Sequence, residues 1–237
     1  AGRQIIVGDM PVEDLTAFTT YTVQILSSLM MLSMIFMQSS RAMASSKRIK
    51  EVLCADIDLT DENCTRPEAK VTEGKIEFKN VSFRYFKNSE GKVLDNINLT
   101  IEPGQTVGII GSTGSGKTTL VQMIPRLYDT DEGEVLVDGV NVKDYKLENL
   151  RNGVGMVLQK NVLFSGTIEE NLMWGDRGAT EEEMKAAAQA AQASLFIDSF
   201  KEGYATELGQ GGVNLSGGQK QRVCIARALL KKPRILI

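Results

Sequence analysis

The pattern of hydrophobic and polar residues divides the chain into an apolar N-terminal part and a mixed C-terminal part. From Leu15 to Ser39 there is no charged residue, and this run exceeds the ~20 residues that a helix needs to cross a hydrocarbon core. Acidic residues precede the run, where a signal peptide would be basic. Basic residues, which mark the cytoplasmic side of a membrane helix, follow it at Arg41, Lys47, Arg48 and Lys50. The pattern predicts a transmembrane helix at about residues 15–39 with its C-terminal end in the cytoplasm.

Polar residues recur within this run at helical spacing. Lipid offers them no hydrogen-bond partner, so the stripe is expected to face other helices or a water-filled cavity. Packing through small residues and contact with a substrate both fit such a stripe. Because one span makes no pathway, we interpret residues 1–53 as the end of a transmembrane domain, with Ala1–Gly8 as the tail of a preceding span. The stripe consists of Thr16, Thr19, Thr20, Gln24, Ser27 and Ser28.

The region after the span changes from polar sequence to alternating strand and helix patterns. Residues 54–74 are polar and acidic and predict a linker. Residues 75–237 predict a parallel α/β core, with an opening antiparallel strand pair as an addition and a helical subdomain. The expected strands are Ile76–Tyr85, with a phase slip near Asn80, and Val93–Ile101, Val107–Ile110, Glu134–Asp138, Val154–Leu158 and Arg234–Ile237. The expected helices are Thr119–Ile124, Leu147–Arg151, Thr180–Phe200 (with a Thr180–Glu183 capping box) and Gln219–Leu230.

A glycine-rich stretch lies between one of these strands and a helix. Its residues are Gly111, Ser112, Thr113, Gly114, Ser115, Gly116, Lys117 and Thr118, and Thr119 follows. Glycines let successive N–H groups point inward as a nest for phosphate oxygens, and the helix start adds partial positive charge. Lys117 can reach the β- and γ-phosphates, and the Thr118 hydroxyl can bind Mg²⁺. A turn that binds nothing is the alternative, but every motif position is filled and the flanks fit, so we expect a nucleoside triphosphate here.

Composition narrows the chemistry. The net charge is −3 and the sequence pI is about 5.3, so nothing indicates a nucleic-acid partner. Three cysteines stand far apart and predict neither a metal site nor a disulfide framework. Histidine is absent, so no imidazole in this sequence acts as a base, a ligand or a phosphate sensor.

A second motif, Leu215-Ser216-Gly217-Gly218-Gln219, follows the first by roughly a hundred residues. With both motifs and a membrane helix before them, the whole chain resembles an ABC transporter of the exporter type. The resemblance implies ATP and Mg²⁺ as cofactors and ATPase activity in the complete protein. It also implies a head-to-tail dimer with a second half-transporter, identical or different. The expected setting is a bacterial plasma membrane, with several spans in the full protein, contact with membrane lipid and an exported small molecule, lipid or peptide.

The resemblance also assigns roles to single residues. Tyr85 matches the aromatic residue that stacks on adenine, and Val93 would pack on the other side of the base. Gln159 matches the glutamine that contacts Mg²⁺ and the attacking water, so Lys117 and Gln159 are the expected catalytic contacts. The second motif is itself a phosphate cradle at a helix start. It would bind the γ-phosphate of a nucleotide held by the partner, through Ser216, Gly217, Gly218 and Gln219.

Two departures from the family pattern leave alternatives open. Gln210 stands where many exporters have a glutamate, which would weaken a charge-based link to the membrane helices. The sequence ends at Ile237, inside the strand expected to carry the Mg²⁺-binding aspartate, with the catalytic carboxylate expected beyond it. The stretches Ile124–Leu127 and Gln159-Lys160 resemble the half of heterodimeric bacterial exporters whose catalytic glutamate is replaced. The alternative is therefore a regulatory half that binds ATP but hydrolyses it poorly, while its partner is active. A soluble P-loop kinase or GTPase is disfavoured, because neither needs the second motif or a charge-free membrane run.

Overall fold

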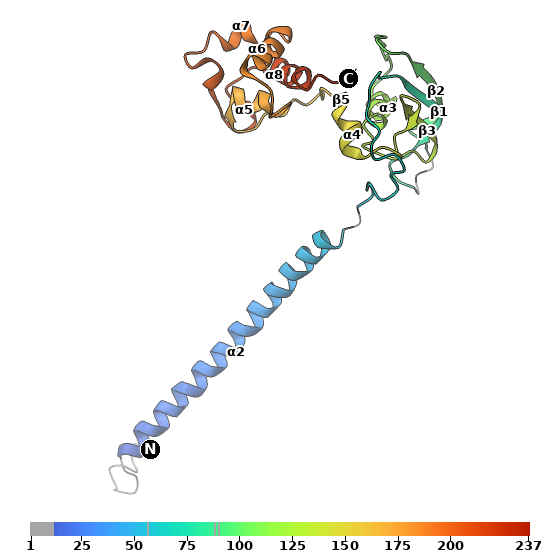
Figure 1. Cartoon of the computed structure of the whole chain (residues 1–237). Coiled ribbons are helices and arrows are strands. Elements are labelled where there is room, and N and C mark those ends of the chain that lie inside the picture. The colour runs from blue at the N-terminus through green and yellow to red at the C-terminus, as the bar shows by residue number, and fades with distance from the viewer. Residues whose placement is uncertain (1–11, 56, 88, 90) are drawn as a thin grey trace. The chain divides into compact units, whose positions relative to one another are not determined.

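The computed structural model describes residues 12–55, 57–87, 89 and 91–237 (Figure 1). The described chain forms two compact units, which divide between Asp58 and Leu59. This boundary lies inside the segment 54–74 that the sequence predicts as a linker, so the rest of that segment belongs with the second unit. The predicted tail of a preceding span, Ala1–Gly8, lies outside the described residues.

In the described part of the first unit, the helix α2 runs without a break from Val12 to Leu53 (Figure 1). No proline or glycine interrupts this range, and acidic residues in the first turn with Lys50 in the last turn complement the helix dipole. The helix is long and apolar enough to cross a membrane by length and composition. Hydroxyls of the predicted polar stripe bond to α2 itself: Thr20 and Ser28 each donate to the carbonyl four residues earlier, at 2.8 Å. Such bonds reduce the cost of placing hydroxyls in lipid.

The second unit begins with an antiparallel sheet in which β1 lies between β2 and β3. Its strands are β1 (Ile76–Phe83), β2 (Leu94–Ile101), β3 (Glu132–Val137) and β4 (Val140–Asn141). The predicted phase slip near Asn80 is confirmed, because the register shifts between Phe78 and Val81 and Asn80 has a φ of 50°. Gly133 has to be glycine opposite this bulge, since a Cβ atom there would lie 2.3 Å from the Asn80 carbonyl oxygen.

Two predicted buried strands differ from the structure. The strand expected at Val154–Leu158 shortens to β5 (Val154–Gly155), which pairs in parallel with β8 (Ile235–Leu236). The Val157 N–H continues the pairing, donating to the Ile237 carbonyl at 2.8 Å. The range Val107–Ile110 forms no strand, and Ile110 is 98% exposed. A strand buried on both faces needs ladder partners, and the described part of the chain places none beside this segment.

Helices make up most of the remaining regular secondary structure that is described. They are α3 (Lys117–Met123), α4 (Leu147–Asn152), α5 (Ile168–Met173), α6 (Glu181–Ala190), α7 (Ser194–Ile197) and α8 (Gly217–Leu230), with short strands β6 (Gly166–Thr167) and β7 (Glu207–Leu208) and 3₁₀ turns η1 (Gly203–Ala205) and η2 (Gln210–Gly212). The capping box of Thr180 with Glu183 is confirmed. The single helix predicted over Thr180–Phe200 is wrong. Gln192, with a φ of 58°, separates α6 from α7, because a left-handed residue cannot continue a right-handed helix.

The described residues of the second unit form two hydrophobic cores. One lies between the antiparallel sheet and α3 and contains Phe78, Val81 and Met123. The other joins α5, α6 and α8 through Leu172, Met184 and Val223, all almost fully buried. The first core packs against α3, which begins at Lys117, and the second against α8, which begins at Gly217.

Asp138 binds the backbone of residues 72–75, which lead into β1. Its carboxylate accepts backbone N–H groups of Thr72, Glu73, Gly74 and Lys75 at 2.7 to 3.1 Å. Partial burial acts to raise the pKa of this carboxyl group, but the four donors outweigh it and hold the pKa below its usual range. The folded state therefore favours the ionised form.

We expect Asp138→Asn to lower the free energy of unfolding by about 1–3 kcal/mol near pH 7, because a neutral amide accepts fewer and weaker hydrogen bonds. The native pKa is depressed, so the carboxylate's contribution is complete above the unfolded pKa of about 3.9 and disappears as the pH falls through the native value. Thermal unfolding of the purified protein at neutral and acidic pH measures both effects. Asp95→Asn is the control, because the Asp95 side chain is 72% exposed. Equal stability of the two variants at pH 7 would contradict this role.

Candidate nucleotide-binding site

The glycine-rich loop leads directly into α3, which begins at Lys117. Gly114 and Gly116 have φ values of 85° and 84°, a conformation that glycine adopts without strain. Gly116 also lies against the start of β2, because a Cβ atom there would be 2.9 Å from the Val93 carbonyl oxygen. The two glycines thus let the loop curl while its end packs against Val93. The first N–H groups of α3 have no partner within the helix and are available to a ligand.

The Lys117 side chain folds back over its own loop. Its Nζ donates to the carbonyl oxygens of Gly111 and Ser112 at 2.8 and 2.7 Å. The Ser115 hydroxyl lies 3.4 Å from the same nitrogen. Because Lys117 makes these bonds at an exposed position, its ammonium group is already at the loop where phosphate oxygens would bind.

The structure brings the predicted adenine-contact residues to the same pocket as the loop. This pocket has a volume of about 290 Å³. The hydroxyls of Tyr85 and Thr119 share a hydrogen bond of 2.8 Å, and Tyr85 is 46% exposed. The ring packs edge-on against Phe83 and Tyr128, with centroids 5.0 and 5.2 Å apart. The pocket is lined by Tyr85, Val93, Gly114, Ser115, Gly116, Lys117, Thr118 and Thr119.

These residues fit a nucleoside triphosphate with Mg²⁺. An aromatic ring, backbone N–H groups of the loop and one cation line the same pocket. Thr118 offers a hydroxyl ligand beside them. Among the described residues, no group of three or more His, Cys, Asp or Glu could hold a metal ion alone. Mg²⁺ would therefore take most of its ligands from phosphate oxygens and water, as it commonly does.

The second predicted motif is at the start of α8. Ser216 is the N-cap: its hydroxyl accepts the Gln219 N–H at 3.3 Å, and its own N–H donates to Gln219 Oε1 at 2.8 Å. This capping box leaves Gly217 and Gly218 exposed, with open space where a Cβ atom would lie. Leu215 is buried and anchors the motif. The first N–H groups of α8 have no partner within the helix and are available to an anion.

The other predicted site residues lie apart from the loop pocket. Gln159 is exposed in a bend after β5, and neither it nor Ser216 is among the residues that line the pocket. Gln210 is exposed at the start of η2. The structure therefore joins the loop with Tyr85 and Val93, and it leaves Gln159 and the Ser216 motif outside this pocket.

Sequence reasoning did not find three residues that the structure places near the predicted site residues. Tyr128 supports the Tyr85 ring, and no local pattern marks it. Arg227 on α8 bonds to the segment that follows Gln159. The sequence analysis gave only the helix around Arg227 and no role for the residue itself. Asn171 is 1% exposed and was also missed, although the preceding Thr167–Glu170 pair fits the capping-box pattern that fixes its helix.

An antiparallel sheet, a phosphate loop opening a helix and a capped Ser-Gly-Gly helix start together define an ABC-type nucleotide-binding domain. The sequence matches the profile of the family described as ABC transporter over residues 94–237, and the chain belongs to the ABC transporter family.

Similarity to known proteins extends over nearly the whole chain. It is 44% identical over 233 residues to the ABC transporter ATP-binding protein YfiB of Bacillus subtilis, covering 98% of this chain and 40% of that protein. It is 40% identical over 231 residues to the ATP-dependent lipid A-core flippase of Pseudomonas aeruginosa, covering 97% and 38%. Among solved structures, a bacterial Atm1-family ABC exporter with ATP bound matches with a TM-score of 0.76 and 35% identity, over 96% of this chain and 40% of that one. The chain thus spans about two fifths of these relatives.

Proposed function

We propose that this chain is part of an ABC exporter subunit that binds and hydrolyses ATP with Mg²⁺ to move a substrate out across the membrane. The observation that carries the proposal is the loop pocket, in which Lys117, Thr118 and the Tyr85 ring face one space. Lys117 and the loop N–H groups would hold the phosphates, the Thr118 hydroxyl the metal, and Tyr85 the base. Bound Mg²⁺ would neutralise charge that develops on the phosphates.

The helix α2 supports a membrane location. At 1.5 Å per residue, its 42 residues span about 63 Å, roughly twice the hydrocarbon thickness. We infer that about residues 15–39 cross the bilayer and that the basic part from Arg41 onward extends into the cytoplasm, the side on which the nucleotide-binding domain would lie. The residues around Gln24 would face other helices of the transporter.

A second half-transporter, identical or different, is the proposed partner. One domain needs only one phosphate cradle for its own nucleotide. The exposed Ser216 motif lies outside the loop pocket of this chain, which supports a role at the partner's ATP. ATP would then join the two domains, and its hydrolysis would release them. The related flippase and Atm1-family exporter support export as the direction of transport.

The proposal predicts that Tyr85→Ala lowers the affinity for ATP about fivefold, because aromatic stacking contributes ~1 kcal/mol. The affinity for inorganic triphosphate should stay the same, since that ligand has no base. Tyr85→Phe keeps the ring and loses only the hydroxyl bonded to Thr119, so it serves as the control with nearly normal ATP binding. Equilibrium titration of the complete protein with both ligands makes the test. Equal losses for ATP and triphosphate would contradict the base contact, and ATP binding without turnover in the unaltered protein would favour the regulatory half.

A further inference from the structure

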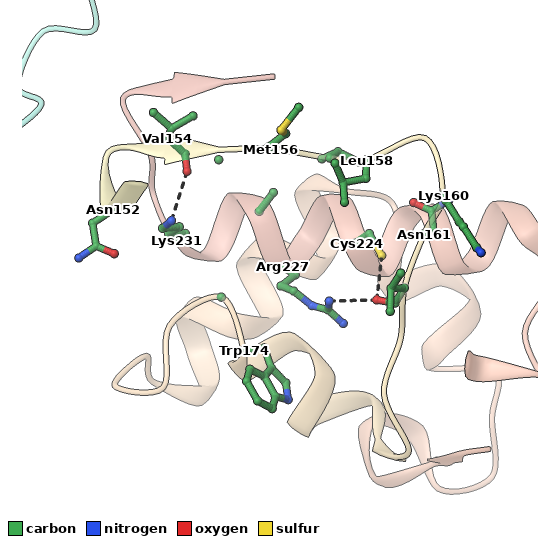
Figure 2. A pocket seen from close by; sticks show the side chains of 15 residues that line it. Asn152, Val154, Met156, Leu158, Lys160, Asn161, Trp174, Cys224, Arg227 and Lys231 are labelled. Carbon is green, nitrogen blue, oxygen red and sulfur yellow. Dashed lines mark hydrogen bonds between the residues drawn. The ribbon is translucent and has the colours of Figure 1, made fainter. Parts of the chain in front are cut away.

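Two cationic side chains extend from α8 to the segment that contains Gln159. Arg227 and Lys231 lie four residues apart in the sequence, which places them on one face of the helix near its C-terminal end. Figure 2 shows Lys231 bonded to the Val154 carbonyl and Arg227 pointing toward the chain that follows Asn161. The other end of the same helix carries the Ser216 motif.

Arg227 binds the C-terminal end of this segment, at Val162. Its Nη1 donates to the Val162 carbonyl at 3.1 Å. The same guanidinium group donates through Nε to the Asn171 carbonyl at 2.8 Å and through Nη2 to Asn171 Oδ1 at 3.0 Å. Asn171 is itself fixed, because its side chain accepts the Phe164 N–H and donates to the carbonyls of Phe164 and Thr167, each at 2.9 Å. The planar fork of the guanidinium group thus sets Val162 and α5 relative to α8.

Lys231 binds the N-terminal end of the segment, at Val154. Its Nζ donates to the Arg151 carbonyl in the last turn of α4 and to the Val154 carbonyl at 3.2 Å. A cation is favourable at a helix C-terminus. Burial lowers the pKa of both Lys231 and Arg227, so each cation is kept at a cost that its carbonyl partners offset.

We propose that Arg227 and Lys231 are positioning residues that tie the Gln159 segment at both ends to the helix that begins at Ser216. Between the two anchors the segment has space to move, because it lines a cavity of about 390 Å³ together with α8. Any displacement that reaches an anchor must pass to α8, which is a rigid rod of about 21 Å at 1.5 Å per residue. Events at Gln159 would thereby set the position of Ser216. The inference rests on the proposed function, in which the Ser216 motif serves the partner's ATP, and on the Mg²⁺ contact that the family resemblance implies for Gln159.

A double-mutant cycle in the complete transporter tests the coupling, with Arg227→Gln, Gln159→Ala and their combination. We expect Arg227→Gln to lower kcat for ATP about tenfold while KM changes less than about twofold, because the pocket at Lys117 is untouched. In the Gln159→Ala background the same substitution should have almost no further effect, since residues acting as one unit are non-additive. Arg227→Lys should recover part of the rate. Lys231→Gln should show the same non-additivity, so the test does not depend on one variant folding.

Arg222→Gln is the matched control. Arg222 is on the same helix, but it donates to the Gln192 carbonyl at 3.2 Å and not to the Gln159 segment. The Arg222→Gln variant should therefore have a normal kcat. Amide hydrogen exchange without nucleotide reads the anchoring independently of activity. Exchange should be faster in residues 157–165 in Arg227→Gln and unchanged there in Arg222→Gln. Unchanged exchange, or losses that simply add to those of Gln159→Ala, would overturn the proposal. Absence of ATP turnover in the unaltered protein would instead refute the proposed function.

Discussion

Lys117→Ala is expected to lower the affinity of the complete protein for ATP about ten- to a hundredfold. A hydrogen bond to a charged group contributes about 1.5–3 kcal/mol, and each 1.4 kcal/mol is about tenfold in affinity. The substitution has a second effect, because Lys117 Nζ also holds the carbonyls of Gly111 and Ser112. Without these bonds the nucleotide-free loop is less well ordered in its curved conformation. Part of the loss in affinity should therefore appear for ADP as well as for ATP.

The measurement is equilibrium titration of purified variants with ATP and ADP in the presence of Mg²⁺. Lys146→Ala removes the same charge at an exposed position whose partner is Glu148, and it should bind both nucleotides normally. The assignment of Lys117 to the phosphates is wrong if the two variants bind ATP with the same affinity. A loss for ATP larger than that for ADP would support contact with the γ-phosphate in particular.

Features that depend on neighbouring residues were predictable from the sequence. The bulge at Asn80 appears as a phase slip in the alternation of β1, and the Thr180–Glu183 box marks the start of α6. The phosphate loop belongs to this class, because all its residues are contiguous and the helix begins within the motif. The glycine at position 116 has a longer-range cause, its contact with the Val93 carbonyl, yet the motif itself already requires it.

Features that depend on distant residues were not predictable. The strand expected at Val107–Ile110 has the right composition, but a strand forms only where other strands supply hydrogen-bond partners. Val107 and Ile109 instead line an apolar hollow of about 580 Å³ with Ile237 and others. Single residues show the same limit. Asp138 bonds to N–H groups more than sixty positions away, and nothing in its Asp-Gly turn indicates them.

The candidate site shows both cases at once. The loop and the Ser216 motif can be recognised in the sequence, whereas the pocket needs β1 to bring Tyr85 to Thr119. The link between Gln159 and α8 is less visible still, because it consists of side-chain bonds to backbone carbonyls at Val154 and Val162. Any residue has a carbonyl, so such contacts have no sequence signature on the acceptor side.

Ser216→Asp should leave ATP binding to this chain within about twofold of normal and lower turnover at the partner's site at least a hundredfold. Aspartate is as good an N-cap as serine, so the start of α8 keeps its capping box with Gln219. The added carboxylate would face the γ-phosphate, and two like charges ~4 Å apart at an effective dielectric constant of about 20 repel by ~4 kcal/mol. Because a cap is retained and a charge is added, a loss of activity here cannot be explained by an unravelled helix.

Thermal unfolding and single-turnover hydrolysis in the intact dimer separate these effects. Ser216→Thr, which keeps both the cap and neutrality, is the control and should turn over ATP at a rate close to normal. The Asp variant should unfold at the same temperature as the Thr variant and still bind ATP at its own Lys117 loop. If the Asp variant hydrolysed ATP at the normal rate, the Ser216 motif would not contact the γ-phosphate. If the Asp variant instead lost ATP binding at its own Lys117 loop, the motif would contact the nucleotide of its own chain. The exposed start of α8 would then give no reason to propose a partner.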